Sequence, residues 1–257
     1  PFIINKSELF ISYSLGISIF PTDADLADAL LTHANIARAT AKSQGGNQFV
    51  FYHADMNAEA QDLLSLENDL RRAVQNNQIE VFYQPQVDAR TFQPTGAEAL
   101  VRWRHPRLGI ISPVVFIPLA ESTGLIIEIG RYVLKAAVKQ AERWHQMGYS
   151  HMRIGINLSG RQFTQSNLME DVQAVISQTT LPARFIDLEI TESLAMSDAE
   201  TNIGILNGLK ALGIALSIDD FGTGYSSLAY LHSFPIDTIK IDRSFVLNLV
   251  NTDGQAI

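Results

Sequence analysis

The chain has 257 residues, of which 46% are hydrophobic and 18% are charged, a composition typical of globular proteins and unlike that of disordered ones. Its net charge of −8 disfavours a nucleic-acid polymer as partner, and the absence of cysteine excludes disulfides, thiolate metal sites and cysteine nucleophiles. No apolar run approaches the roughly 20 residues of a membrane helix, and no secretory signal opens the chain. We expect no membrane contact by this segment and a cytoplasmic location, either free or as part of a membrane-anchored parent.

The first part of the chain predicts a small α+β unit. Residues 11–20, ISYSLGISIF, alternate like a strand, and residues 26–41 follow a helical period that ends before Gly45 and Gly46. The segment NQFVFY predicts a second strand that ends at Tyr52. Residues 55–77 predict an amphipathic helix with a charged outer face, which suits a connector. We therefore divide the chain into residues 1–54, the connector 55–77, and a domain over 78–257.

Strand-like and helical segments alternate from residue 79 onward. The strand-like segments are EVFYQPQV, TGAEALVRW, RIGINLS, FIDLEITE, IALSIDD and IDTIKID. A helix is predicted over 129–144, another near 168–176, and a third that opens with a capping box from Ser197 to Glu200 and ends before Gly213. A strand followed by a helix, repeated about every 30 residues, predicts parallel strands with right-handed crossovers. A barrel and an open doubly wound sheet both satisfy this pattern.

Polar side chains within the strands favour the barrel. Because side chains alternate along a strand, Glu98, Leu100 and Arg102 share one face, as do Glu189 with Thr191 and Lys240 with Asp242. Charged groups at successive strand ends converge on one mouth in a (β/α) barrel, whereas an open sheet spreads them along a line. The intervening residues are expected under the helices: Ile186, Leu188, Ile190, Ile239 and Ile241.

The residue types at the strand ends indicate metal-assisted chemistry. Hard oxygen ligands suited to Mg²⁺ or Mn²⁺ are offered by Glu98, Asn157, Glu189, Asp219 and Asp220. Lys240 and Arg102 add positive charge for a phosphate. Any one of these acids could instead be a helix cap, a turn residue or a surface charge, but together they would be buried charges that need partners. The DFG of DDFGTGYSSL (219–228) is not a kinase signature here, since no HRD loop or glycine-rich phosphate loop precedes it.

Six ordered motifs resemble those of EAL-family phosphodiesterases over residues 60–257. They are FYQPQVD (82–88), EALVRWRHP (98–106), INLS (156–159), LEITE (188–192), DDFGTGYSSL (219–228) and IKIDRSF (239–245). The resemblance implies a TIM-like (β/α) barrel with an antiparallel first strand, and hydrolysis of the bacterial second messenger cyclic di-GMP to linear pGpG with two divalent metals, Mg²⁺ or Mn²⁺. It also implies a homodimer through this domain and upstream sensory domains in the parent.

The resemblance assigns roles residue by residue. It makes Glu98, Asn157, Glu189 and Asp219 ligands of one metal, and Asp220 a ligand of the second. Lys240 would lie beside the attacking water, and Glu192 would anchor the loop that starts at Asp220. The implied catalytic set is thus Glu98, Lys240, Asp220 and Glu192, and the substrate would be contacted by Gln84, Leu100 and Arg102.

The two ends of the chain depart from the full family pattern. Residues 1–52 resemble the C-terminal end of a GGDEF diguanylate cyclase domain, but Asn35, Arg38 and Ala39 replace the commoner residues, and we expect no cyclase activity. The last segment, VLNLVNTDGQAI, lacks the glutamate and glutamine of the family's final strands, so we expect a C-terminally truncated barrel. The alternatives to a hydrolase are a catalytically inactive cyclic di-GMP sensor and an enolase-like magnesium enzyme.

Overall fold

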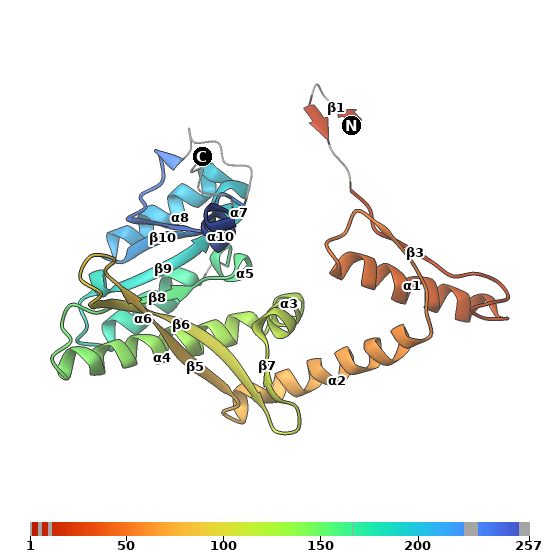
Figure 1. Ribbon diagram of the computed structural model, residues 1–257, viewed down its shortest axis with the longest axis horizontal. Helices are drawn as coiled ribbons and strands as arrows, with labels where there is room; N and C mark the ends of the chain where they lie inside the picture. The colour runs from red at the N-terminus through yellow and green to blue at the C-terminus, as the bar shows by residue number, and fades with distance from the viewer. Residues whose placement is uncertain (1, 5–6, 10–11, 166, 224–230, 252–257) are drawn as a thin grey trace. The chain divides into compact units, whose positions relative to one another are not determined.

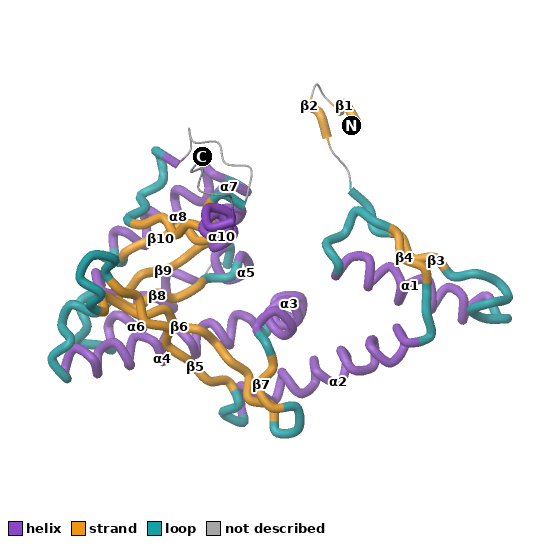
Figure 2. Tube along the Cα trace, viewed as in Figure 1, coloured by secondary structure: helices purple, strands orange, loops and turns teal. Residues whose placement is uncertain are grey.

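The computed structural model describes all residues except 1, 5–6, 10–11, 166, 224–230 and 252–257. The chain divides into two compact units, Pro1–Asp69 and Leu70–Ile257 (Figures 1 and 2). Helix α2 (Asp55–Gln75) runs across the division. No helix among the described residues combines the length and the apolar character needed to cross a bilayer.

The first unit is a small α/β arrangement. The short strands β1 (Phe2–Ile4) and β2 (Ser7–Leu9) pair antiparallel, and β3 (Leu15–Ile17) pairs parallel with β4 (Phe49–Phe51). Helix α1 (Ala27–Ser43) packs on this pair, with a core of Ala37, Tyr52 and Met56. The predicted strand over 11–20 is too long, because β4 offers only three partners. In addition, Ser18 Oγ donates to the Leu30 carbonyl and the Ile19 amide donates to Asp23, which turns the chain away from the pair.

A seven-stranded mixed sheet forms the frame of the second unit. Its order is β11-β10-β9-β8-β6-β5, with β7 paired to β6 outside this path. The strands are β5 (Ile79–Val87), β6 (Pro94–His105), β7 (Gly109–Ile111), β8 (Arg153–Asn157), β9 (Ile186–Thr191), β10 (Ala215–Phe221) and β11 (Thr238–Ile241). Strand β5 is antiparallel to β6, whereas β6, β8, β9, β10 and β11 run parallel. This confirms the predicted antiparallel first strand.

Helices follow the parallel strands, and several of them pack on the sheet. They are α3 (Pro113–Thr123), α4 (Ile126–Gln146), α5 (Gly160–Phe163), α6 (Leu168–Ser177), α7 (Glu192–Ser197), α8 (Ala199–Ala211) and α10 (Arg243–Asn251), with a 3₁₀ turn at Ala183–Phe185. The apolar stripe of α4 packs on the sheet through buried residues such as Ile129, Val133 and Ala137. Helix α4 lies along β5, β6 and β8 (Figure 1).

Strand alternation predicted the helix-facing core correctly in β9 but not in β11. Ile186, Leu188 and Ile190 are at most 1% exposed, whereas Ile239 and Ile241 are 43% and 66% exposed. The reason is position: β11 ends the path of paired strands in the described part of the chain. An end strand has a neighbour on one side only, so its apolar side chains gain less cover.

The predicted capping box at Ser197 is also wrong. Ser197 is the last residue of α7, where its hydroxyl donates to the Leu194 carbonyl, and α8 begins after Asp198 instead. A reciprocal capping box does exist at the start of α5, between Ser159 and Gln162. Gly213 has a φ of +85°, as predicted for the residue that ends α8.

Candidate metal-binding active site

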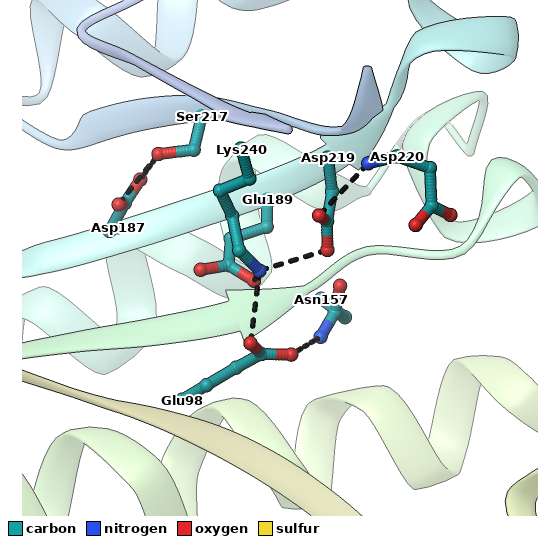
Figure 3. A network of polar contacts seen from close by, with 8 residues as sticks. All are labelled: Glu98, Asn157, Asp187, Glu189, Ser217, Asp219, Asp220 and Lys240. Atoms are coloured by element: carbon teal, nitrogen blue, oxygen red, sulfur yellow. Dashed lines mark hydrogen bonds and ion pairs between the residues drawn. The ribbon is translucent and has the colours of Figure 1, made fainter. Parts of the chain in front are cut away.

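The charged and polar side chains of the site come from neighbouring strands of the sheet. Glu98 lies in β6, Asn157 ends β8, and Glu189, Asp219 and Lys240 lie in β9, β10 and β11. The backbone register sets Glu98 beside Gly155, and Asn157 beside Glu189. Because parallel strands all point the same way, these side chains meet at one end of the sheet (Figure 3).

Lys240 is the centre of the cluster. Its Nζ lies 2.9 Å from Glu98 Oε2, 2.6 Å from Glu189 Oε2 and 2.9 Å from Asp219 Oδ2. The Glu189 side chain is 1% exposed and the other two carboxylates are 17% and 22% exposed. When all are ionised, three carboxylates face one ammonium, so the site keeps an excess of negative charge that favours a further cation.

Burial and pairing set the protonation of the two central groups. Burial raises the pKa of Glu189 to about 7, although the hydrogen bond and charge of Lys240 oppose this. Burial alone would lower the pKa of Lys240, but hydrogen bonds with Glu189, Asp219 and Glu98 outweigh it and raise the pKa above its usual value. Lys240 is therefore a permanent ammonium near neutral pH and acts by charge and hydrogen bonding rather than as a base.

The residues present fit a divalent cation. Glu98, Glu189 and Asp219 each offer a carboxylate oxygen, and the three oxygens lie within 4.8 Å of one another. Glu189 Oε1 is buried without a hydrogen-bond partner, and Asn157 Nδ2 donates to Glu98 Oε1 at 2.7 Å, which places its amide at the rim. Oxygen ligands of this kind suit Mg²⁺ or Mn²⁺.

Gly155 leaves the space that the Glu189 carboxylate occupies. A Cβ at this position would overlap Glu189 Oε1. On strands β10 and β9, the Ser217 hydroxyl lies 2.8 and 2.7 Å from the two carboxylate oxygens of Asp187. A cavity of about 520 Å³ extends from Glu189 and Lys240 past this pair toward Arg153. Sequence reasoning missed Asp187 and Ser217, although each lies two residues before a predicted ligand and so shares its face.

Asp220 lies next to this cluster but apart from it. Its φ is +53°, a left-handed conformation that Asp tolerates better than most residues, and its amide donates to Asp219 Oδ1 at 2.9 Å. In Figure 3 its carboxylate lies apart from those around Lys240 and makes none of the contacts drawn. Partial burial, and then repulsion by Asp219 and Asp242, raise the pKa of Asp220. The structure thus places two adjacent carboxylates of β10 at separate positions, one in contact with Lys240 and one outside the cluster.

Glu192 makes the contact expected of a loop anchor. It is the first residue of α7, its side chain is buried, and its Oε2 accepts a hydrogen bond from the Gly222 amide at 2.6 Å. Gly222 has a φ of +98°, so the turn that follows Asp220 depends on a residue that adopts this conformation without strain. Of the DDFGTGYSSL segment, residues 224–228 lie outside the described residues.

The remaining predicted residues lie on the same face of the β5–β6 pair. Gln84 is directly opposite Glu98, and Leu100 is opposite Phe82. Arg102, two residues beyond Leu100, donates a hydrogen bond to the Val101 carbonyl at 2.8 Å. Directly opposite residues of an antiparallel pair share a face, so Gln84, Leu100 and Arg102 border the acidic cluster.

Comparison with known proteins identifies similar chains. A model of the EAL domain family matches residues 67–257. The bifunctional diguanylate cyclase/cyclic di-GMP phosphodiesterase MucR of Pseudomonas aeruginosa is 43% identical over 256 residues, which are 100% of this chain and 37% of MucR. The cyclic di-GMP phosphodiesterase PdeR of Escherichia coli is 36% identical over 249 residues, which are 97% of this chain and 37% of PdeR. The chain therefore spans little more than a third of these two relatives.

Solved structures give the same result for the fold. The PaMucR phosphodiesterase in its c-di-GMP complex matches with a TM-score of 0.71 at 44% identity, over 74% of this chain and 76% of that chain. The EAL enzyme Bd1971 in its cAMP- and cyclic-di-GMP-bound form matches with a TM-score of 0.70 at 36% identity, over 89% of this chain and 60% of that chain. The predicted TIM-like α/β fold is confirmed.

Proposed function

Because the chain belongs to the EAL domain family, we propose that its acidic site hydrolyses cyclic di-GMP to linear pGpG in bacterial second-messenger signalling. The observation that carries the proposal is the cluster of Glu98, Glu189 and Asp219 around Lys240 at adjacent strand ends. The cluster offers oxygen ligands for a divalent cation together with an ammonium that can bind a phosphodiester oxygen. MucR and PdeR, which carry this activity in their names, support the same choice of substrate.

The proposed metal ligands divide into two groups. Glu98, Asn157, Glu189 and Asp219 would hold one Mg²⁺ or Mn²⁺, and Asp220, which lies apart from them, would serve a second. When bound, such cations would supply a water of lowered pKa and would neutralise charge on the phosphate in the transition state. For Asn157 to serve as a ligand, its amide would have to present Oδ1, since Nδ2 now points to Glu98.

The protein groups would bind and orient the reactants. Lys240 stays protonated, and its three N–H groups now serve Glu98, Glu189 and Asp219. Once these carboxylates bind a cation, N–H groups would be free to donate to the attacking water or to a phosphate oxygen, without removal of a proton. Gln84, Leu100 and Arg102 would contact the substrate from the β5–β6 side of the mouth. Glu192 would hold the turn at Gly222 and so the direction in which Asp220 points. No covalent intermediate on a side chain is needed for this reaction.

The purified chain incubated with cyclic di-GMP and Mg²⁺ or Mn²⁺ tests this function. We expect pGpG to appear on ion-exchange chromatography, and chelation of the metal to stop its formation. Glu98→Gln should lower the rate at least about 100-fold, whereas Glu128→Gln, at an exposed position in the first turn of α4, should leave it unchanged. Binding of cyclic di-GMP without turnover at any metal concentration would instead identify a sensor module.

We also propose that residues 1–54 form the C-terminal part of a GGDEF-like unit and residues 55–77 a helical connector to the domain over 78–257. This part of the proposal rests on the sequence resemblance. The chain should form no cyclic di-GMP from GTP, and formation of that product would contradict the proposal. A homodimer through the EAL domain is likewise proposed, and light scattering on the purified chain measures it.

A further inference from the structure

A large aromatic side chain lies beside the acidic cluster without being part of the core. Phe82, in β5, is 42% exposed. It is directly opposite Leu100, and Gln84, two residues further on, is opposite Glu98. Phe82 therefore belongs to the same face of the sheet as the proposed metal ligand, two pairs further along the ladder. Its ring adds an apolar surface next to a site that is otherwise polar.

The guanidinium of Arg102 lies over one face of this ring. Its guanidinium carbon lies 5.8 Å from the centroid of the Phe82 ring, within the range of a cation–π interaction. The hydrogen bond that the described residues give Arg102 goes to the Val101 carbonyl, and none of the ion pairs between described residues involves it. The guanidinium therefore keeps donor groups that a ligand can use.

A flat ring next to a guanidinium has the chemistry of a nucleobase site. Aromatic rings and arginine planes both stack on bases, and this stacking favours purines through their larger ring area. Arginine can also donate two hydrogen bonds to O6 and N7, the pair of acceptors that guanine presents and adenine does not. Phe82 and Arg102 thus combine a surface for any purine with donors that distinguish guanine.

We infer that Phe82 and Arg102 form a purine-binding shelf beside the acidic cluster, with Phe82 stacking on a guanine of the substrate. The inference rests on the proposed function, because the shelf is useful only if a phosphodiester with purine bases binds at Glu98, Glu189 and Asp219. A base joined through its ribose to a phosphate at that cluster would reach sideways along the β5–β6 pair, where Phe82 lies.

Two Phe82 variants and one control test the shelf in the full chain. Phe82→Leu keeps an apolar side chain but removes the ring, and Phe82→Tyr keeps the ring. Phe92→Leu removes an exposed aromatic ring from the hairpin tip that joins β5 to β6, where Phe92 is 76% exposed. For each protein, the Kd and KM of cyclic di-GMP are compared with those of cyclic di-UMP, which has the same sugar–phosphate ring but smaller bases. Circular dichroism checks folding.

Phe82→Leu should raise the Kd and KM of cyclic di-GMP about tenfold, in line with the loss of one stacked base. It should change those of cyclic di-UMP less than about threefold and leave kcat close to the wild-type value. Phe82→Tyr and Phe92→Leu should both behave as the wild type. Arg102→Lys should reduce the preference for cyclic di-GMP over cyclic di-AMP, because lysine cannot donate the paired hydrogen bonds.

The outcomes separate the shelf from the proposed function. An active wild type whose Phe82→Leu variant binds both dinucleotides as before would overturn the shelf alone. A wild type that binds cyclic di-GMP without hydrolysing it would overturn the proposed function, and the Kd comparison would still decide the shelf. Equal weakening toward cyclic di-GMP and cyclic di-UMP would show that Phe82 supports the fold of the mouth rather than a purine.

Discussion

Lys240 Nζ lies 2.6 Å from Glu189 Oε2, the shortest of the three contacts that join this ammonium to the acidic cluster. The Glu189 side chain is 1% exposed, so its charge depends on Lys240 or on a bound cation for compensation. Removing one partner of a buried ion pair leaves the other without compensation, which destabilises the folded state more than the intact pair stabilises it. The same arrangement therefore links stability to metal binding.

Lys240→Met should destabilise the metal-free protein by about 2 kcal/mol, a value reduced from that of fully buried pairs because Lys240 is 22% exposed. Mn²⁺ should restore much of this loss, since a cation bound by the three carboxylates favours the folded state. Urea denaturation at pH 8, with EDTA or with Mn²⁺, measures both effects. Lys210→Met is the control, because its ion pair with Asp237 is more exposed and should contribute about 1 kcal/mol or less. Equal losses in the two variants would contradict the prediction.

Glu189→Gln should change how stability depends on pH. Because burial raises the pKa of Glu189 to about 7, above the 4.5 of the unfolded chain, the folded wild type holds more protons between these values. Its free energy of unfolding must then fall as the pH rises from about 4.5 to about 7. The variant lacks this decline. Over this pH range the free energy of unfolding of the wild type should therefore fall by about 2–3 kcal/mol more than that of the variant.

Urea denaturation of the metal-free proteins between pH 5 and pH 8 measures this slope. Glu128→Gln, at an exposed position, should keep the wild-type slope. If Glu189→Gln and the wild type lose stability in parallel over this range, the assignment of a raised pKa to Glu189 is wrong.

Asp220→Asn should abolish turnover while leaving the fold intact. The residue is exposed, and asparagine tolerates the positive φ of this position as well as aspartate does. We expect a loss of at least about 100-fold in kcat, with the free energy of unfolding changed by less than about 0.5 kcal/mol. Asp88→Asn, in the β5–β6 hairpin, serves as control because asparagine can still accept the amides of Arg90 and Thr91. Unchanged turnover in Asp220→Asn would remove Asp220 from the site.

Glu192→Ala should weaken metal use through the Gly222 turn. The variant loses the 2.6 Å hydrogen bond from the Gly222 amide, so the turn that directs Asp220 is no longer held. The Mn²⁺ concentration for half-maximal activity should rise about tenfold, the range typical when a group that orients ligands is lost. Hydrogen exchange at the Gly222 amide should accelerate. Glu192→Gln still offers an acceptor oxygen, so its Mn²⁺ concentration for half-maximal activity should lie between those of the wild type and Glu192→Ala. Identical values for all three proteins would rule out the anchoring role.

The sequence predicted the residues of the site better than their arrangement. Strand alternation and parallel order were enough to place Glu98, Glu189, Asp219 and Lys240 on one mouth, because both follow from backbone geometry. The position of Lys240 between the three carboxylates depends on strand register and side-chain rotamers. No sequence motif encodes these. The roles assigned to these residues in catalysis stay predictions until the variants are measured.

The errors have local physical causes. Ser197 to Glu200 has the spacing of a capping box, but α7 already occupies Ser197, and a pattern of four residues cannot tell where the preceding helix ends. Ile239 and Ile241 alternate like core residues, but the burial of a side chain also depends on what packs beside its strand. Among the described residues β11 is an end strand, so both side chains stay exposed. The sequence gives Phe82 no distinguishing signal, because a single aromatic residue in a strand more often indicates packing than binding.

The antiparallel pairing of β5 with β6 also restricts how this part of the domain can change in length during evolution. Because opposite residues share a face, inserting one residue inside β5, for example after Pro85, would shift the preceding residues by one position relative to β6. Gln84 and Phe82 would then turn toward α4, and Tyr83 and Val81 would enter the mouth instead. Insertions at the hairpin tip, residues 88–93, leave the pairing of β5 with β6 unchanged, so each side chain stays on its face. Length variation among functional homologues should therefore be found in the hairpin and be excluded from the strand.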